Sequence, residues 1–489
     1  MTRRAIALAS VLVALASCGG GSGASDSVPS SSVPTATSID WSPCTTDSQL
    51  DCATFKVPYD YTGRTEGEFT LKLVRHPAAD PAKRIGTMLV NPGGPGFGGT
   101  FIPENADGYL SQDLLDRFDV VGWDPRGTGE SKPFVDCIDD YDRYFSYDPT
   151  PSNDAERQAM LDATKEFSAA CDAKNHDILP WISTNNTARD MDRIRAALGE
   201  DRITYFGFSY GSELGATWAT MFPGTVRAAV LDGAVDPEAD YIQGGLDQAK
   251  GFEHELATFL AKCSSDVKCI FHNGGDAEGA FDRLMASLDA NPLTVSSDRT
   301  KVNLSVALTA VSQAMYSSSM WPDLESALAE AQKGDGSGLL RLNDDYYQRN
   351  ADGTYGNELE AFNAIMCVDD PGPKTAKETE SYVPQFKAIA PRLWPGFSSG
   401  YGCIYWPAKP DLRIRITGKG AGPILVVGTT GDAATPLAST RKMAAALEDG
   451  HLVVVTGDHH TGYGANQCVL DAVDTYLISL TVPYKEKKC

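Results

Sequence analysis

Short apolar runs recur along this chain and alternate with stretches of helical periodicity. The runs are rich in β-branched residues and predict buried strands near residues 87–90, 118–123, 203–206, 227–231, 423–427 and 451–455. Stricter alternation of apolar and polar residues at 55–57 and 69–73 predicts two earlier antiparallel strands. Strands that alternate with helices indicate an α/β protein, in which a mostly parallel central sheet carries helices on both faces. One such helix is predicted at 189–199, where Gly199 provides the stop.

Two segments interrupt the strand–helix order, a smaller insertion at residues 133–185 and a long one at residues 241–404. The long segment has helical periodicity at 251–262, 277–288 and 304–316, and it predicts a large helical cap inserted between the late strands. Caps of this kind restrict access to an active site and exclude water from it. The core is then divided between residues 41–240, which contain the smaller insertion, and residues 405–489.

The sequence Gly207-Phe208-Ser209-Tyr210-Gly211 lies between the predicted strand at 203–206 and a helical stretch. A G-x-S-x-G turn in that context is typical of the nucleophile elbow of α/β-hydrolases. The glycines are expected because a Cβ on either side of the strained apex would clash with the adjacent strand or helix. The pattern predicts Ser209 as a catalytic nucleophile, with chance occurrence of a short motif as the alternative.

A serine nucleophile needs a base that accepts its proton and a carboxylate that orients the base. In α/β-hydrolases these residues follow the serine in the order Asp or Glu, then His. Of the seven histidines, His459 and His460 lie in the loop after the last predicted strand. Either qualifies as the base, and His460 is preferred. Activity should fall as this histidine is protonated, near pH ~6 to 7.

The acid is predicted to be Asp432, in the loop after the strand at 423–427. Its alternative role is that of a turn or N-cap aspartate before a helix that begins near Pro436. Asp236, after the strand at 227–231, is the second candidate for the acid.

Two backbone N–H groups should face the oxyanion of the tetrahedral intermediate. One is expected from Tyr210, directly after the nucleophile. The other is expected from Gly94, in the glycine-rich loop 91–99 that follows the strand at 87–90. This loop lacks the G-x-G-x-x-G spacing and the Lys-Ser/Thr ending of a phosphate cradle.

Together these residues resemble the tripeptidyl aminopeptidase and proline iminopeptidase-type serine peptidases, and especially the secreted enzymes of actinobacteria. The resemblance covers nearly all of the mature chain and rests on residues 91–96, 124–131, 187–192, 207–211 and 231–237, on Asp432, and on His460-Thr461. It implies the α/β-hydrolase fold and the triad Ser209, Asp432 and His460. Two positions depart from the family pattern: Gly98 replaces a serine in the oxyanion loop, and His459 replaces the glycine before the catalytic histidine.

The second of these motifs contains Asp124 and Arg126. Both residues are predicted to be structural rather than catalytic. They are expected to tie neighbouring loops together through a charge-assisted pair.

Residues 1–18 have the features of a bacterial export signal. Arg3 and Arg4 precede a short apolar stretch, and Leu15-Ala16-Ser17-Cys18 resembles a lipobox. The stretch is too short to cross a membrane, and an ordinary signal peptide with an incidental cysteine is the alternative. We predict lipid attachment at Cys18 and a flexible tether at residues 19–40, so that the protein is anchored on the extracytoplasmic side or secreted.

The chain has 11 cysteines, and ten remain when Cys18 is set aside. Local spacing suggests the pairs Cys44–Cys52, Cys137–Cys171, Cys263–Cys269, Cys367–Cys403 and Cys468–Cys489, although spacing alone does not prove connectivity. Disulfides fit an oxidising compartment. The chain contains no CxxC pair, and its one histidine cluster, His459 and His460, is poorly placed to share an ion because the two residues are adjacent. Neither a metal nor a cofactor is predicted.

The net charge of −23 argues against nucleic acid as a partner, because phosphate repels an acidic surface. The length of 489 residues and a hydrophobic content of 42% allow a large core and more than one domain. We expect a monomer whose one contact with a membrane is its lipid anchor.

An enzyme that acts at free N-termini needs a carboxylate that holds the ammonium group of its substrate. The candidates are Asp369, Glu253 and Glu213, with Asp370 and Glu255 as further options. Each is also explained as a solvated or helix-start carboxylate. The main hypothesis is an exported serine aminopeptidase that cleaves short peptides, tripeptides by resemblance, from free N-termini. The alternatives are a carboxylesterase or lipase with the same triad, and a non-catalytic surface lipoprotein.

Overall fold

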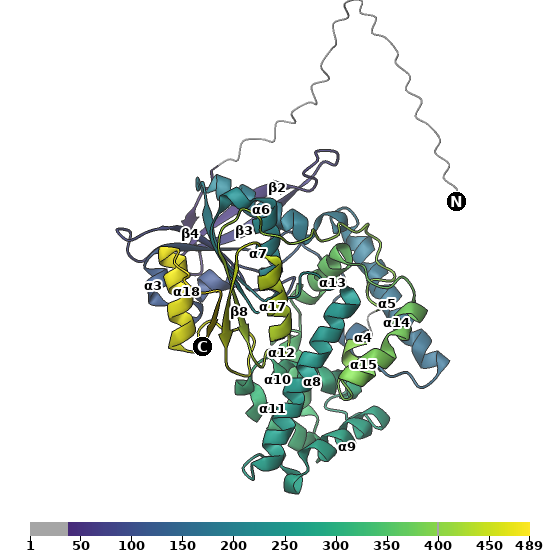
Figure 1. The fold of residues 1–489 in the computed structure, drawn as a ribbon. Coiled ribbons are helices and arrows are strands. Elements are labelled where there is room, and N and C mark those ends of the chain that lie inside the picture. Colours follow the sequence, from purple (N-terminus) through teal and green to yellow (C-terminus); the bar gives the residue numbers. More distant parts are fainter. Residues whose placement is uncertain (1–37, 399–400) are drawn as a thin grey trace, which may run out of the picture. The chain divides into compact units, whose positions relative to one another are not determined.

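A mostly parallel sheet of ten strands forms the centre of the computed structural model, which describes residues 38–398 and 401–489 (Figure 1). The strand order is β1-β2-β3-β5-β4-β6-β7-β8-β9-β10. The pairs β1–β2, β2–β3 and β3–β5 are antiparallel. Every pair from β5–β4 to β9–β10 is parallel. The strands are β1 Ser42–Pro43, β2 Asp51–Pro58, β3 Glu68–His76, β4 Gly86–Asn91, β5 Phe118–Trp123, β6 Ile203–Phe208, β7 Val226–Asp232, β8 Ile424–Thr429, β9 Gly450–Val455 and β10 Glu486–Lys488.

The helices fall into those that accompany the sheet and those that form two insertions. The first group is α1 Phe101–Glu104, α2 Ala106–Tyr109, α3 Gln112–Leu115, α6 Thr184–Ala197, α7 Tyr210–Met221, α17 Leu437–Ala446 and α18 Gln467–Ser479. The smaller insertion contains α4 Tyr141–Phe145 and α5 Asp154–Asn175. The long insertion contains α8 Tyr241–Ser265, α9 Ala277–Ala290, α10 Leu304–Met315, α11 Trp321–Ala331, α12 Ser337–Tyr346, α13 Glu358–Asp369, α14 Ala376–Ser381, α15 Val383–Ile389 and α16 Trp394–Phe397.

The sheet is covered on both faces because successive side chains of its buried strands point in opposite directions. Tyr205 in β6 and Val426 in β8 pack with α6, α7 and α17 in one hydrophobic cluster. The next residue in each strand, Phe206 and Val427, packs with α3 and α18 in another. Figure 1 shows α18 and α17 on opposite sides of the sheet. This arrangement explains why the strands read as continuous apolar runs.

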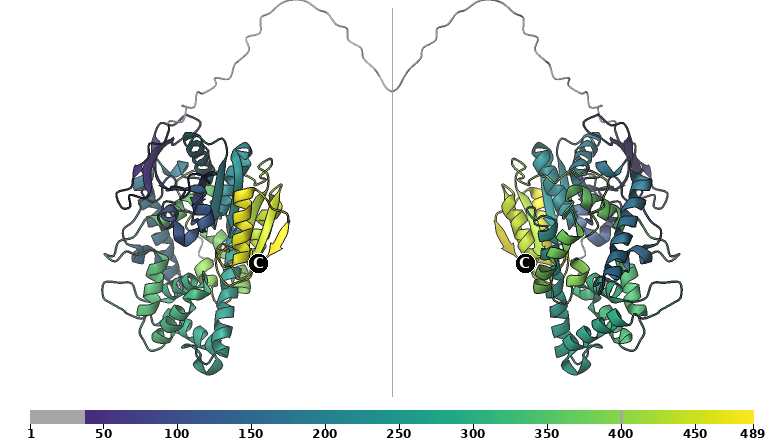
Figure 2. Two further views of the ribbon diagram at one scale, coloured as in Figure 1. Left: turned by 90° about the vertical axis from the view of Figure 1, so that its left-hand side faces the viewer. Right: turned by 90° about the vertical axis from the view of Figure 1, so that its right-hand side faces the viewer.

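The long insertion has a hydrophobic core of its own, to which α8 to α12 contribute. Both views of Figure 2 show its teal and green helices gathered at one end of the sheet. Ala433 and Ala434, in the loop that follows β8, belong to the core of the insertion. The insertion therefore packs against the loops that follow the carboxyl ends of the parallel strands, where ligands bind in open α/β sheets.

The predicted fold class is confirmed, and the predicted strands are present with slightly different ends. Strands β1 and β10 were not predicted, because two or three residues carry no periodicity. The helix predicted at 189–199 begins earlier, at Thr184, where the Ser183 side chain caps it by accepting a hydrogen bond from the Asn186 N–H.

The five predicted cysteine pairs are disulfides in the structure. The last one ties α18 to the chain end beside β10. Cys18 and residues 19–37 of the predicted tether lie outside the described residues. Within residues 38–398 and 401–489, no helix has both the length and the apolar character needed to cross a bilayer.

Candidate active site

Ser209 lies at the turn between β6 and α7 with a backbone φ of 55°. This left-handed conformation is unfavourable for a residue with a Cβ, and it persists where the surroundings enforce it. The two motif glycines are required by close packing: a Cβ on Gly207 would lie 2.3 Å from the Gly211 carbonyl oxygen, and one on Gly211 would lie 2.8 Å from the Asn91 carbonyl oxygen. The geometry is that of a nucleophile elbow.

The glycine-rich loop after β4 packs directly on this elbow. A Cβ on Gly93 would lie 2.8 Å from the Ser209 Cβ and 3.1 Å from the Tyr210 nitrogen. Gly93 and Gly94 both have positive φ, which brings the backbone close to the serine without a side chain in the way. Among the described residues, neither the Gly94 N–H nor the Tyr210 N–H donates to a side chain or a loop carbonyl. Both N–H groups therefore stay available for the predicted oxyanion role.

Asp432 and His460 are brought together as the sequence predicts. The Nδ1 atom of His460 lies 2.8 Å and 2.9 Å from the two carboxylate oxygens of Asp432. The Asp432 side chain is fully buried and that of His460 is 10% exposed. A carboxylate at this distance fixes the tautomer that leaves Nε2 free to accept a proton.

Ser209 and His460 both border the end of β7. The Ser209 N–H donates to the Asp232 carbonyl at 2.8 Å, and a Cβ on the next residue, Gly233, would lie 3.0 Å from the Cε1 atom of His460. No hydrogen bond joins the Ser209 hydroxyl to His460 among the described residues. Such contacts are often long in an enzyme without substrate and tighten when substrate binds.

The structure adds residues around the histidine that the sequence reasoning missed. The Asp232 carboxylate accepts hydrogen bonds from the Gly462 and Tyr463 N–H groups at 2.8 Å and 2.7 Å, and so fixes the loop that carries the histidine. The Thr435 side chain and N–H both donate to Asp432, at 2.9 Å and 2.8 Å. The sequence did point to this region, because Asp232 is the last residue of β7, and Asp236 in the loop after that strand was the second candidate for the acid.

The second candidates have other partners. The Asp236 carboxylate pairs with the Lys442 ammonium at 2.6 Å. His459 directs Nδ1 to the Thr461 carbonyl at 2.8 Å rather than to a carboxylate. The contacts therefore favour Asp432 over Asp236 and His460 over His459.

The three carboxylates predicted to hold a substrate amine are engaged within the protein. Glu213 forms an ion pair with Arg413 at 2.9 Å. Glu253 accepts hydrogen bonds from the Arg392 and Leu393 N–H groups at 3.1 Å and 3.0 Å. Asp369 accepts from Thr184 through both of its oxygens. These bonds already stabilise the three carboxyl groups, so less of their negative charge is left to bind the ammonium group of a substrate.

The two further options differ from each other. Asp370 accepts from the same guanidinium group of Arg413, at 3.2 Å. Glu255 is buried, and its Oε1 atom makes no hydrogen bond among the described residues. Burial, together with the nearby charge of Asp458, raises the pKa of Glu255 to about 7.

The expected pair between Arg126 and Asp124 does not form. Arg126 is fully buried and makes a bidentate ion pair with Asp190 in α6, at 2.6 Å and 2.7 Å. Asp124 instead accepts from the Glu130 N–H at 2.8 Å and from Thr100. Both residues have structural roles. The ion pair of Arg126 connects the loop after β5 to α6, and does not join Arg126 to Asp124 as predicted.

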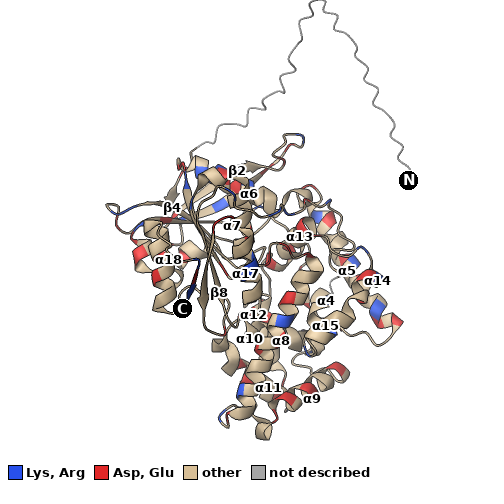
Figure 3. Ribbon diagram, viewed as in Figure 1, with Lys and Arg blue, Asp and Glu red and all other residues tan. Residues whose placement is uncertain are grey.

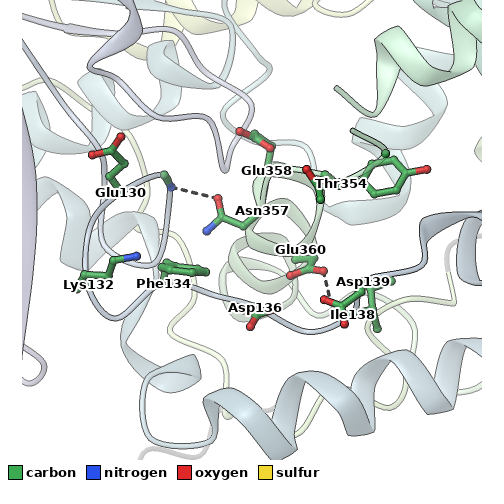
Figure 4. Close-up of a pocket in the computed structure, with 14 residues that line it drawn as sticks. Glu130, Lys132, Phe134, Asp136, Ile138, Asp139, Thr354, Asn357, Glu358 and Glu360 are labelled. Carbon is green, nitrogen blue, oxygen red and sulfur yellow. Dashed lines mark hydrogen bonds between the residues drawn. The ribbon is translucent and has the colours of Figure 1, made fainter. Parts of the chain in front are cut away.

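A cavity of about 600 Å³ lies between the loop that follows β5 and the first turn of α13. Figure 4 shows five carboxylates around it, Glu130, Asp136, Asp139, Glu358 and Glu360, together with one lysine, Lys132. Glu360 is tied to the Cys137 and Ile138 N–H groups. Gly96, in the glycine-rich loop, approaches the same helical turn so closely that a Cβ on it would lie 2.4 Å from the Glu358 carbonyl oxygen. The cavity therefore adjoins the loop that borders Ser209.

No group of three or more metal-ligating side chains occurs in the part of the chain that the structure describes. The chemistry available at the site is that of a serine nucleophile, a histidine base and backbone N–H donors.

The acid limb of the activity profile is expected above pH 6.5. Burial lowers the pKa of His460, but the charge and hydrogen bond of Asp432 and the charge of Asp232 outweigh burial and hold that pKa above 6.5. Because only the neutral imidazole accepts the serine proton, kcat/KM should fall as pH drops through this raised pKa. The measurement is kcat/KM between about pH 5 and about pH 9, with circular dichroism at each pH to show that the fold is intact. A midpoint below about pH 6 would contradict the raised pKa.

The strained serine turn and the Asp–His pair at the ends of parallel strands define a serine hydrolase with the α/β-hydrolase fold. Family models agree: residues 86–273 match the model "alpha/beta hydrolase fold", and residues 395–489 match "TAP-like protein". The chain belongs to this TAP-like family of serine hydrolases.

Three curated relatives span most of the chain. It is 34% identical to serine protease Hip1 of Mycobacterium tuberculosis, with 92% of this chain and 91% of the relative covered. It is 33% identical to carboxylesterase B of the same species, with 90% and 86% covered. It is 29% identical to the tripeptidyl aminopeptidase of Streptomyces lividans, with 92% and 86% covered. The protein is a hydrolase of the peptidase type.

Proposed function

We propose that the protein is an exported serine aminopeptidase that releases short peptides, tripeptides in the first instance, from free N-termini. The observation that carries this proposal is that the long insertion contacts the catalytic loops on two sides. An enclosed site accepts the end of a peptide more readily than the middle of a folded chain. The tripeptidyl aminopeptidase relative supports the length of the product.

On the histidine side, the segment after α10 forms an antiparallel bridge with the histidine loop. The His460 N–H donates to the Tyr316 carbonyl at 2.8 Å, and the Ser318 N–H donates to the Asp458 carbonyl at 2.9 Å. On the oxyanion side, the first turn of α13 packs against Gly96. Substrate would therefore reach Ser209 between two contacts made by the same insertion.

The acidic character of the insertion supports recognition of an ammonium group. Figure 3 shows acidic residues in red along the ribbons of α9, α13 and α14. The cavity beside α13 adds carboxylates close to the glycine-rich loop. A negative potential of this kind attracts a protonated N-terminus and repels a free carboxylate end.

The proposed reaction follows from the geometry. Ser209 Oγ attacks the scissile carbonyl carbon while His460 Nε2 accepts its proton, and the oxyanion faces the Tyr210 and Gly94 N–H groups. His460 then protonates the leaving amine as the C–N bond breaks, and the N-terminal fragment stays on Ser209 as an ester. Water that has lost a proton to His460 hydrolyses this ester and restores the serine.

The location outside the cytoplasm is part of the proposal. Five disulfides fit an oxidising compartment. Lipid attachment at Cys18 would hold a monomer at the membrane surface, with peptides and no nucleic acid as partners. Mass spectrometry of the N-terminal peptide after expression in an actinobacterial host would test the attachment.

The test of function is cleavage of matched chromogenic amides by one preparation of the full chain. Cleavage of a free tripeptide amide is expected, with the corresponding N-acetylated amide cleaved at least about 100-fold more slowly, because it has lost the ammonium group. Release from a single-residue amide alone would make the enzyme an iminopeptidase-like exopeptidase. Equal cleavage of free and acetylated amides would exclude an aminopeptidase.

A second candidate function is that of a carboxylesterase, which the carboxylesterase B relative favours. It needs the same triad and predicts hydrolysis of simple esters with no cleavage of the three amides. The amide series and a p-nitrophenyl ester, assayed side by side, separate the two functions.

A further inference from the structure

A buried chain of hydrogen bonds connects the end of α13, in the long insertion, to the first residue of α7. The Asp369 carboxylate lies 2.9 Å from the Thr184 N–H and 2.5 Å from the Thr184 hydroxyl. The Thr184 hydroxyl is also hydrogen-bonded to the Tyr210 phenol. Asp369, Thr184 and Tyr210 are 4%, 1% and 7% exposed, so water does not compete for these bonds.

The hydrogen bonds between Asp369, Thr184 and Tyr210 can form whether the Asp369 carboxyl group is ionised or neutral. When Asp369 is ionised, the Thr184 hydroxyl donates to it and accepts from the Tyr210 phenol. When Asp369 is neutral, its own O–H donates to Thr184, which then donates to Tyr210. Burial raises the pKa of Asp369 to about 8, and neither state leaves the phenol without a partner.

Tyr210 follows the strained Ser209 and carries one of the two N–H groups predicted to face the oxyanion. Other contacts hold the elbow from the sheet side: Ser209 N–H donates to Asp232, and the Tyr205 hydroxyl donates to the Gly211 carbonyl at 2.8 Å. The bond from Tyr210 to Thr184, the first residue of α6, connects the elbow through Thr184 to Asp369 in the long insertion. A strained turn keeps its conformation only while its surroundings fix it.

We propose that Thr184 and Asp369 are positioning residues for the oxyanion site: they anchor the Tyr210 side chain and thereby hold its N–H toward the reacting carbonyl. Asp369 is the last residue of α13. The hydrogen-bonded residues therefore also connect the position of the long insertion to the reactivity of Ser209. The proposal rests on the predicted roles of Ser209 and Tyr210, and not on the identity of the substrate. It differs from a role of Asp369 as a ligand for the substrate amine, because both of its oxygens are already hydrogen-bonded to Thr184.

The test uses the full chain and two probes that do not require a peptide, p-nitrophenyl acetate and a fluorophosphonate. Tyr210→Phe and Thr184→Val each remove a hydroxyl and keep the shape of the side chain. Each should lower kcat for the ester and the rate of fluorophosphonate labelling about tenfold, because small misplacements of reacting groups have effects of this order. KM should change by less than about twofold, since the lost interaction acts in the transition state. Thr184→Ser keeps the hydroxyl and should recover most of the rate that Thr184→Val loses.

A matched control separates positioning from stability. Tyr476 is a buried tyrosine in α18 whose hydroxyl donates to the Pro423 carbonyl at 2.5 Å and accepts from the Ala229 N–H. Tyr476→Phe loses two buried phenol hydrogen bonds of about 1 kcal/mol each, whereas Tyr210→Phe loses one. The control should therefore lower Tm at least as much as Tyr210→Phe, yet leave kcat unchanged. If Tyr210 and Thr184 act as one unit, the double variant should be no slower than the slower single variant.

Three results would overturn the proposal. The first is a kcat within about twofold of the wild type in both Tyr210→Phe and Thr184→Val. The second is a rate loss of the same size in Tyr476→Phe. The third is an Asp369→Asn variant that raises KM for free-amine peptides alone and leaves the ester kcat intact, which would assign Asp369 to the substrate instead. Failure of the aminopeptidase proposal would leave the ester and labelling results unaffected.

Discussion

Replacement of Ser209 by alanine is expected to reduce kcat by roughly 10⁴-fold to 10⁶-fold, for amides and esters alike. Without the hydroxyl oxygen no acyl-enzyme forms, and only substrate binding and the oxyanion donors remain. The same change should abolish labelling by a fluorophosphonate, which reacts with an activated serine. Both quantities can be measured on one preparation, by turnover of a chromogenic substrate and by mass spectrometry of the labelled chain.

Ser212→Ala is the matched control, because Ser212 lies one turn further along α7 and is also buried. Its hydroxyl accepts a hydrogen bond from the Val235 N–H at 3.3 Å, so its loss affects stability near the elbow without removing the nucleophile. This variant should still be labelled. Labelling that persists in Ser209→Ala would place the nucleophile elsewhere in the chain.

The two adjacent histidines are expected to differ sharply. His460→Ala removes the base and the partner of Asp432, and kcat should fall by roughly 10⁴-fold to 10⁶-fold. His459→Ala removes a hydrogen bond to the Thr461 carbonyl, with an expected loss of about 1 kcal/mol of stability and less than about tenfold in kcat. The measurements are kcat with the best substrate and Tm for both variants.

The comparison matters because His459 and His460 are adjacent and the sequence left either one as a candidate for the base. Equal losses in the two variants at unchanged Tm would mean that both histidines take part in proton transfer. A large loss in His459→Ala alone would reverse the assignment and leave the Asp432–His460 pair a structural contact.

Much of the fold and of the candidate site was predictable because the signals are local. Buried parallel strands read as apolar runs, and the turn after each strand is marked by glycine, aspartate or histidine. Since the carboxyl ends of parallel strands meet at one edge of a sheet, the loops after β4, β6, β8 and β9 had to converge. The order of Ser209, Asp432 and His460 along the chain therefore sufficed to propose a triad. Local spacing also predicted the five disulfides, the longest of which spans 36 residues.

The partners of charged and polar side chains could not be predicted from local sequence signals. Glu213 and Arg413 lie 200 residues apart in sequence, and Thr184 and Asp369 lie 185 apart. No periodicity relates such positions, because their approach depends on how the long insertion packs against the loops after the parallel strands. For the same reason Arg126 pairs with Asp190 in α6 and not with Asp124.

The sequence by itself determined the class of protein: an α/β core, a serine at a strained turn, and an acid and a base after later strands. These features depend on residues close together in the chain, whose conformations follow from local sterics and periodicity. Only the tertiary structure decided which carboxylates are already paired, how the insertion contacts both sides of the site, and what holds Tyr210. Those properties arise from contacts between distant segments, which form only when the hydrophobic cores of the sheet and the insertion have packed.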